Sequence, residues 1–418
     1  MKRKNLFIAA SLLMGAALSA CGGGGSKETT PDLTGNYKFE VWCAKEAVTS
    51  TEVQLENYKK TLPEGCTVEF EVNPVGEGDA AGNMLTDVES GADIYCFAQD
   101  QLARLVAAGA LDQITGNVKT EVTARNDGGS VKAGTHKEKL YAFPLTSDNG
   151  YFMYYDKSVI NPSSIGDLSL ILADAKAAGK FVYYDGGGWY NASFFFATGC
   201  QSTWTQNEDE TWTISKDDYN SANGVISAKG LAALVNHENY VNGSSAGTAF
   251  GSNAAVCISG TWDYNAAVEK LGDNFACAEL PSFTVGGKAY HLGSFSGNKL
   301  MGVKPQSGDK KLQRTYLAKQ IASFLTNEEN QLARFNSLKW GPSNLNAQQN
   351  AAVKANPALV ALNAQAKYAT PQGQYPGAWW DAAAAIVTDL QKLETVSPTD
   401  EQVKAVLKAY EDSIKAIQ

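Results

Sequence analysis

Short strand-like runs alternate with helical stretches along this chain, and that alternation most constrains its fold. Residues 37–42, 67–72 and 92–97 have the composition or the apolar–polar alternation of strands. Helical spacing follows each of them, at residues 51–60, at residues 82–89 and through Leu102, Leu105 and Val106. A βαβαβα order makes right-handed crossovers, so it predicts a parallel α/β sheet.

Three loops follow the carboxyl ends of these strands, at residues 43–49, 73–79 and 97–101. Ligands of such sheets bind in the crevice beyond the strand ends. These loops are therefore where we expect a site.

The later chain continues in the same style, without an internal repeat. Residues 181–184 and 254–259 are predicted strands, and the acidic stretch 204–219 indicates a surface insertion in the form of a hairpin. Thr399 and Gln402 have the spacing of a helix-capping start. Further helices are predicted from residue 192 and at 312–325, 327–335, 378–393 and 399–417.

Composition excludes several classes of function. The chain has 418 residues, of which 44% are hydrophobic, so it can bury the cores of two or three domains. Its net charge of −9 argues against nucleic acid as a partner, because phosphate binding needs clustered Lys and Arg. Three His residues leave little room for a zinc site or a His-based triad. We expect no catalytic residues, metal or cofactor.

The first twenty residues are typical of a secretory signal peptide. Lys2, Arg3 and Lys4 precede an apolar run at residues 6–18, which is shorter than the ~20 residues a membrane-spanning helix needs. Leu-Ser-Ala-Cys at residues 18–21 resembles the lipobox of bacterial lipoproteins, in which the Cys is lipidated.

The segment after Cys21 supports the lipoprotein interpretation. Residues 21–35 are rich in Gly and polar side chains, which is the composition of a flexible tether. We expect an exported, monomeric chain held by lipid at the outer face of the cytoplasmic membrane, or on the periplasmic side where the cell has an outer membrane.

Six cysteines remain in the mature chain, and an even number in an exported protein permits disulfides. Four of them lie inside apolar strand-like runs, which favours buried free thiols. The sequence leaves disulfide pairing open. The six are Cys43, Cys66, Cys96, Cys200, Cys257 and Cys277.

Two enzyme motifs match only loosely. Residues 76–81 fit G-x-G-x-x-A, but the acid that a dinucleotide site needs at the end of the next strand is missing. Residues 243–247 fit G-x-S-x-G, but no apolar strand precedes them as in a nucleophile elbow. Carboxylates at strand ends, including Asp185, leave a glycosidase pair open as a rival.

Seven separated stretches of the chain form a recognisable series when they are taken in order. They are residues 91–100 (GADIYCFAQD), 107–114 (AAGALDQI), 139–144 (KLYAFP), 154–157 (YYDK), 259–262 (SGTW), 280–281 (LP) and 293–297 (GSFSG). Together they resemble family 1 of the extracellular solute-binding proteins, the maltose/maltodextrin-binding type of ABC sugar importers. The resemblance covers roughly residues 37–417.

The resemblance implies two α/β lobes with the sugar in the cleft between them. The N-lobe would comprise residues 36–146 and 281–338, and the C-lobe residues 148–279 and 343–418. Crossings near residues 146–147, 281 and 341–342 would serve as hinges.

Aromatic rings can stack on the C–H faces of a sugar. By resemblance, Trp262 and Trp380 fall at stacking positions, with Trp379 a near rival for the second. Trp189 stands where the family has a stacking Tyr, and Phe97 at another aromatic site.

Carboxylates can accept the hydrogen bonds of sugar hydroxyls. The resemblance gives this role to Glu46, Asp100 and Asp148. Three departures leave the sugar open: Gln101 stands where the maltose binder has Arg, Ala47 where it has Lys, and Gly187 where it has Glu.

The resemblance thus implies a lipoprotein that captures a carbohydrate and delivers it to the permease of an ABC importer. The expected carbohydrate is an oligosaccharide of maltodextrin type. Two alternatives remain: a secreted glycoside hydrolase, and a binder of another small solute such as a polyol. We expect a glycerol phosphate to be disfavoured, because no Arg or Lys is predicted at the cleft loops.

Overall fold

The computed structural model describes residues 30–417. The predicted signal peptide, the lipidation at Cys21 and the tether up to residue 29 lie outside the described residues. None of the helices within residues 30–417 is long and apolar enough to span a bilayer.

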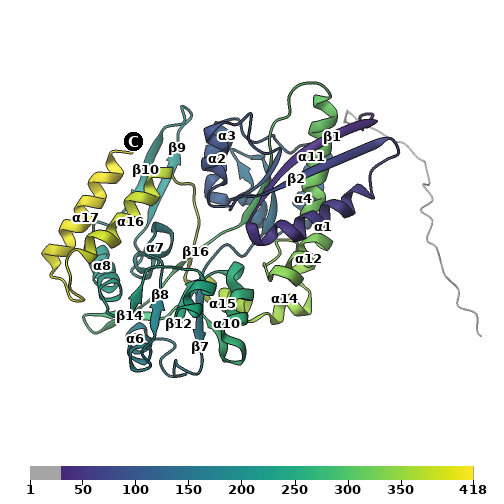
Figure 1. The fold of residues 1–418 in the computed structure, drawn as a ribbon. Helices are drawn as coiled ribbons and strands as arrows, with labels where there is room; N and C mark the ends of the chain where they lie inside the picture. The colour runs from purple at the N-terminus through teal and green to yellow at the C-terminus, as the bar shows by residue number, and fades with distance from the viewer. Residues whose placement is uncertain (1–29, 418) are drawn as a thin grey trace, which may run out of the picture. The chain divides into compact units, whose positions relative to one another are not determined.

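The first sheet has five strands in the order β2-β1-β3-β17-β6. Figure 1 shows its long strands β1 and β2 side by side. The first three are parallel, as predicted, while β17 runs antiparallel to both β3 and β6. Their bounds are β1 Gly35–Cys43, β2 Cys66–Pro74, β3 Ile94–Ala98, β6 Ala142–Thr146 and β17 Lys299–Val303.

Both faces of this sheet are buried, since successive side chains of a strand point to opposite faces. In β3, Ile94 and Cys96 join one hydrophobic cluster, and Tyr95 and Phe97 join another. The helices of this part are α1 Val48–Lys59, α2 Ala80–Thr86, α3 Leu102–Ala107, α4 Gly116–Arg125, α5 Gly128–Ala133, α11 Lys311–Leu325 and α12 Glu328–Leu338, with a small ladder of β4 Thr135–His136 and β5 Lys139–Leu140.

The second sheet also has five strands, in the order β11-β8-β12-β7-β13. Strands β11, β8 and β12 are parallel, and β7 runs antiparallel to β12 and β13. Their bounds are β7 Phe152–Asp156, β8 Phe181–Tyr183, β11 Tyr240–Val241, β12 Ala254–Ser259 and β13 Phe275–Ala278.

The remaining helices belong to this part of the chain, and several of them pack apolar side chains on the second sheet. Thr399 and Gln402 form the predicted capping box at the start of α17. The helices are α6 Leu168–Ala177, α7 Gly188–Ala197, α8 Ala222–Val235, α9 Ala246–Gly251, α10 Tyr264–Leu271, α13 Leu345–Gln348, α14 Ala351–Ala355, α15 Pro357–Gln365, α16 Gly377–Gln391 and α17 Asp400–Lys415.

Two hairpins accompany the second sheet. The predicted insertion is confirmed as β9 Ser202–Gln206 paired with β10 Trp212–Asp217. The hairpin of β14 Ser282–Val285 and β15 Lys288–His291 corrects a predicted boundary, because residues 281–292 were expected in the N-lobe. Phe283 instead packs into the core of the second sheet, with its ring centroid 5.1 Å from that of Phe194.

The chain crosses back only after β16 Ser294–Ser296, which pairs with β18 Ala369–Pro371. The three crossings lie side by side, because Asn149 N donates to Gly297 O (3.1 Å) and Ser147 N donates to Gly341 O (3.1 Å). The second crossing is therefore near residues 297–298 and not at Pro281.

All six cysteines of the described residues are free; five are buried and Cys277 is half-buried. Burial raises the pKa of the Cys43 thiol to about 11 and that of Cys277 to about 12, so both remain protonated thiols at neutral pH.

Candidate functional site

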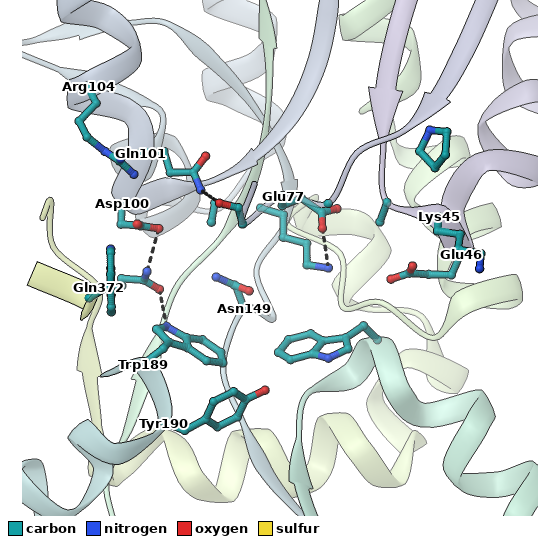
Figure 2. Close-up of a pocket in the computed structure, with 18 residues that line it drawn as sticks. Lys45, Glu46, Glu77, Asp100, Gln101, Arg104, Asn149, Trp189, Tyr190 and Gln372 are labelled. Atoms are coloured by element: carbon teal, nitrogen blue, oxygen red, sulfur yellow. Dashed lines mark hydrogen bonds and ion pairs between the residues drawn. The ribbon is translucent and has the colours of Figure 1, made fainter. Parts of the chain in front are cut away.

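A pocket of about 560 Å³ lies beyond the carboxyl ends of strands from both sheets. Figure 2 shows the residues that line it. Three short 3-10 helices bring side chains into it directly after strands: Lys45–Ala47 after β1, Gln99–Gln101 after β3, and Thr261–Asp263 after β12. The loop after β2 adds Glu77. All three loops that the sequence singled out thus meet at one pocket.

Three half-buried tryptophans line the pocket: Trp189, Trp262 and Trp380. The ring centroids of Trp189 and Trp262 are 6.0 Å apart, and the Trp189 ring lies parallel to that of Phe295 at 6.4 Å. The structure therefore gathers all three indoles that the sequence proposed for stacking.

Glycines place these rings. A Cβ at Gly188 would lie 2.8 Å from the carbonyl oxygen of Trp380, so only glycine lets α7 approach α16 this closely. The ring of Trp262 folds back over Gly260, where a Cβ would lie 2.1 Å from it. The Gly-rich turns before the two tryptophans are thus packing requirements.

Trp379 and Trp380 have different environments. Trp379 is fully buried, and its Nε1 donates to the Tyr410 hydroxyl at 3.1 Å. Trp380 is half-buried and lines the pocket. Of the two rivals, Trp380 is the ring that faces the site.

Asp100 lines the pocket with 5% of its surface exposed. Gln372 Nε2 donates to its Oδ1 at 2.9 Å, and Gln372 Oε1 accepts from Trp189 Nε1 at 3.2 Å (Figure 2). Burial raises the pKa of Asp100 to about 7, against the opposing charge of Arg104. One amide thus holds a predicted acceptor and a predicted stacking ring together.

The raised pKa of Asp100 predicts a pH dependence of stability. Between its ordinary value near 3.8 and about 7, the folded chain keeps a proton that the unfolded chain has released, so unfolding becomes easier as pH rises through this window. Burial also raises the pKa of Asp217 and Asp263, which gives the same sign. We expect Asp100→Asn to make the fall in melting temperature from pH 5 to pH 8 shallower than in the wild type. An unchanged slope would contradict the raised pKa.

Glu46 lies at the pocket rim with an exposed side chain, next to exposed Lys45. Its placement agrees with a hydroxyl-binding acid, which stays a prediction.

Phe97 and Asp148 are placed differently from the prediction. Phe97 has no exposed surface and packs beside Tyr95, with ring centroids 5.7 Å apart. Strand alternation turns it into the core, one residue before the chain reaches the pocket at Ala98. Asp148 is buried at the crossings, where its Oδ2 accepts from Thr261 Oγ1 and from Gly341 N. Neither residue lines this pocket.

The position of Asp148 predicts a structural effect. Hydrogen bonds to a buried carboxylate contribute ~1.5–3 kcal/mol, so Asp148→Ala should lower the free energy of unfolding by about that much in urea titration. Asp148→Asn keeps an accepting oxygen and should lose less. Weaker ligand binding in Asp148→Ala at unchanged stability would contradict this assignment.

The sequence interpretation missed several wall residues. Lys299, Arg104, Gln372, Asn149 and Tyr190 line the pocket alongside Glu77. The expectation that the cleft loops lack cations is wrong, because Lys45 lies in the loop after β1 and lines the pocket. Lys299 enters from the amino end of antiparallel β17, which lies at the cleft, and Arg104 follows Asp100 by about one helical turn.

The enzyme motifs have ordinary structural roles. Ser245, the serine of G-x-S-x-G, caps α9 by accepting from Thr248 N at 3.4 Å. Gly76 and Gly78 form the turn that carries Glu77 into the pocket.

A family of bacterial extracellular solute-binding proteins matches residues 55–361 of the chain. The chain belongs to this family. A galactooligosaccharide-binding protein of Bacillus subtilis (strain 168) is 23% identical to this solute-binding protein over 327 residues, which cover 72% of each chain.

Solved structures confirm the predicted two-lobed α/β fold of this solute-binding protein. A chain solved with acarbose matches with a TM-score of 0.79 and 24% identity, covering 92% of this chain and 100% of that one. The maltodextrin-binding protein of L. casei BL23 matches with a TM-score of 0.75 and 22% identity, covering 92% and 99%.

Proposed function

We propose that this protein captures an oligosaccharide outside the cell and delivers it to the membrane permease of an ABC importer, without chemical change. The observation that carries the proposal is the pocket formed by three tryptophans and acidic side chains at the strand ends of two sheets. Apolar ring faces bind sugar C–H faces, and carboxylates and amides bind hydroxyls.

The size and charge of the pocket support an uncharged polyhydroxyl ligand. Its volume of about 560 Å³ is within the ~300–1,000 Å³ of small-molecule sites. Two of the three cations have an acid beside them: Lys45 is next to Glu46, and Lys299 is paired with Glu77. The third, Arg104, faces Asp100, whose pKa is raised to about 7. The relatives named for galactooligosaccharide, maltodextrin and acarbose add support.

The lobes are proposed to close on the sugar. The N-lobe would comprise residues 36–146 and about 299–338, the C-lobe the rest of the described chain, and the crossings between them would act as hinges. Asp100 precedes the first crossing and Trp262 follows it, so a sugar that binds both favours the closed state. A ligand shifts such an equilibrium only by its differential affinity for the two states.

Lipid anchoring through Cys21 is proposed from the sequence. We expect Cys21→Ser to move the protein from the membrane fraction to the soluble fraction of fractionated cells, because the anchor would be lost. Cys43→Ser is the matched control, since Cys43 is a buried core thiol. Retention of Cys21→Ser in the membrane fraction would contradict the anchor. We expect the anchored protein to be monomeric and to bind no nucleic acid.

A thermal-shift screen over monosaccharides, polyols and malto- and galacto-oligosaccharides tests the proposed function. A ligand present at ~100 times its dissociation constant stabilises by ~2.7 kcal/mol, so a true ligand gives a clear rise in melting temperature. The proposal expects oligosaccharides to give that rise. Stabilisation by a polyol alone would favour the other-solute alternative.

One observation favours a second candidate, a lipid-anchored glycoside hydrolase. A buried carboxyl with a pKa raised to about 7 is the feature that a glycosidase uses as its general acid. Analysis of the oligosaccharide after incubation separates the two, since only the hydrolase shortens it.

A further inference from the structure

The ion pair between Glu77 and Lys299 lies in the pocket wall with its hydrogen bonds incomplete (Figure 2). Lys299 Nζ is 3.5 Å from Glu77 Oε2, and the two side chains are only 6% and 11% exposed. Charge-assisted N–H···O bonds are about 2.7–2.9 Å long. The remaining oxygen, Glu77 Oε1, is buried and has no hydrogen-bond partner within residues 30–417.

The ammonium group of Lys299 is held by ring faces. It lies 3.8 Å from the ring centroid of Trp340 and 5.2 Å from that of Trp262. Its one acceptor in the described part of the chain is the distant Glu77 carboxylate. Ring faces steady a cation but take none of its hydrogen bonds in the way an oxygen does, so N–H donors remain for another group.

Glu77 is positioned by a dedicated side chain. Gln101, which is 2% exposed, donates from Nε2 to Gly78 O at 2.7 Å and accepts at Oε1 from Ala81 N at 3.0 Å. Ala98 N donates to Glu77 O at 3.1 Å. The Gln101 amide thus holds the loop that carries Glu77.

A buried, under-bonded ion pair is costly to fold. Removing two charges from water costs several kcal/mol per ion, and attraction offsets this only with good geometry and further hydrogen bonds. The chain supplies neither to this pair. A ligand with one donor and one acceptor close together would complete it, and neighbouring sugar hydroxyls have that chemistry.

We propose that Glu77 and Lys299 together bind two adjacent hydroxyls of the sugar ring that stacks on Trp262. One hydroxyl donates to the Glu77 carboxylate, and its neighbour accepts from Lys299 Nζ. This assignment rests on the proposed function and makes the pair a specificity determinant: it accepts a ring with both hydroxyls free and rejects one that lacks either.

The test replaces both charges at once. A double variant, Glu77→Leu with Lys299→Met, leaves no lone buried charge, and exchanging a buried pair for apolar side chains is often neutral or stabilising. The exposed pair Lys38–Glu71, which is 65% and 53% exposed, gives the matched control as Lys38→Met with Glu71→Leu. Affinity for maltotriose and galactotriose is measured by calorimetry, and apo stability by melting.

The proposal predicts that the Glu77/Lys299 double variant melts near the wild-type temperature but binds the preferred trisaccharide about 30-fold or more weakly, since hydrogen bonds to charged groups are the strong ones. The control should bind like the wild type. A trisaccharide analogue lacking one of the two hydroxyls should bind the wild type about 10-fold or more weakly than the parent trisaccharide does. The double variant should bind the analogue and the parent trisaccharide with equal affinity.

Equal affinity of the wild type and the double variant would overturn the proposal and leave the pair a structural one. Binding of neither trisaccharide nor any other saccharide to the wild type would instead overturn the proposed function, and the sugar assignment with it.

Discussion

Replacing Trp380 by alanine is expected to weaken sugar binding by about 2–4 kcal/mol, the usual loss for an aromatic anchor, with little change in apo stability. Replacing the preceding Trp379 should do the opposite. Trp379 has no exposed surface and stacks on Tyr375 at 4.4 Å, so Trp379→Ala should lower the free energy of unfolding by ~3–5 kcal/mol.

Each variant is the control for the other, because the two residues are adjacent in α16 and both substitutions remove an indole. Calorimetric titration gives the affinities, and urea unfolding of the apo proteins gives the stabilities. If Trp380→Ala unfolds easily while Trp379→Ala loses only affinity, the assignment of the two rings is reversed.

Replacing Trp262 by alanine should also cost about 2–4 kcal/mol of binding free energy. The ring follows β12, is half-buried and forms the pocket wall beside Lys299, so its loss removes a stacking face. Trp262→Phe keeps an apolar face and should lose less. Titration with the preferred oligosaccharide and melting of the apo protein measure both effects.

The Trp262→Ala substitution should lower the stability of the apo protein much less than it lowers the binding free energy, since the indole already has exposed surface. Unchanged affinity together with a large loss of apo stability would show that Trp262 is a core residue and that the cleft lies elsewhere.

Strands and helices with strong local patterns could be predicted from the sequence. The strand expected at residues 254–259 is β12 itself, and the predicted helices of the C-terminal part begin and end within a few residues of α16 and α17. Residues 254–259 are a short continuous apolar run, and the helices carry a period-3.6 pattern or an explicit capping signal; both are local properties.

The sequence places the return of the chain to the first sheet too early, because a crossing segment and a hairpin of the second sheet have the same strand-like pattern. Residues 282–291 form strands, as a crossing segment would. The packing of Phe283 against Phe194 and against Gly230 of α8, where a Cβ would lie 2.3 Å from the ring, assigns them to the second sheet. These contacts join positions far apart in the sequence and leave no local signal.

The residues of the site also divide into those that the sequence identifies and those that depend on tertiary contacts. The resemblance to the solute-binding family assigns the three tryptophans to stacking positions, and all three line the pocket. The same resemblance assigns Phe97 to an aromatic site, but one step along β3 turns a side chain from the cleft into the core. Lys299 and Gln372 were missed because each reaches the pocket through a crossing or an antiparallel strand. Their roles depend on tertiary partners, such as Glu77 and Asp100.

The most direct test of the central claim is to titrate the purified protein with the oligosaccharide that stabilises it most, and then to recover and analyse that sugar. We predict saturation at one sugar per chain, binding weakened by about 2–4 kcal/mol in each of the Trp262→Ala and Trp380→Ala variants, and recovery of the oligosaccharide intact after prolonged incubation. Shortened products that disappear in Asp100→Asn or Asp148→Asn would contradict capture without chemistry. Absence of saturable binding would contradict capture itself.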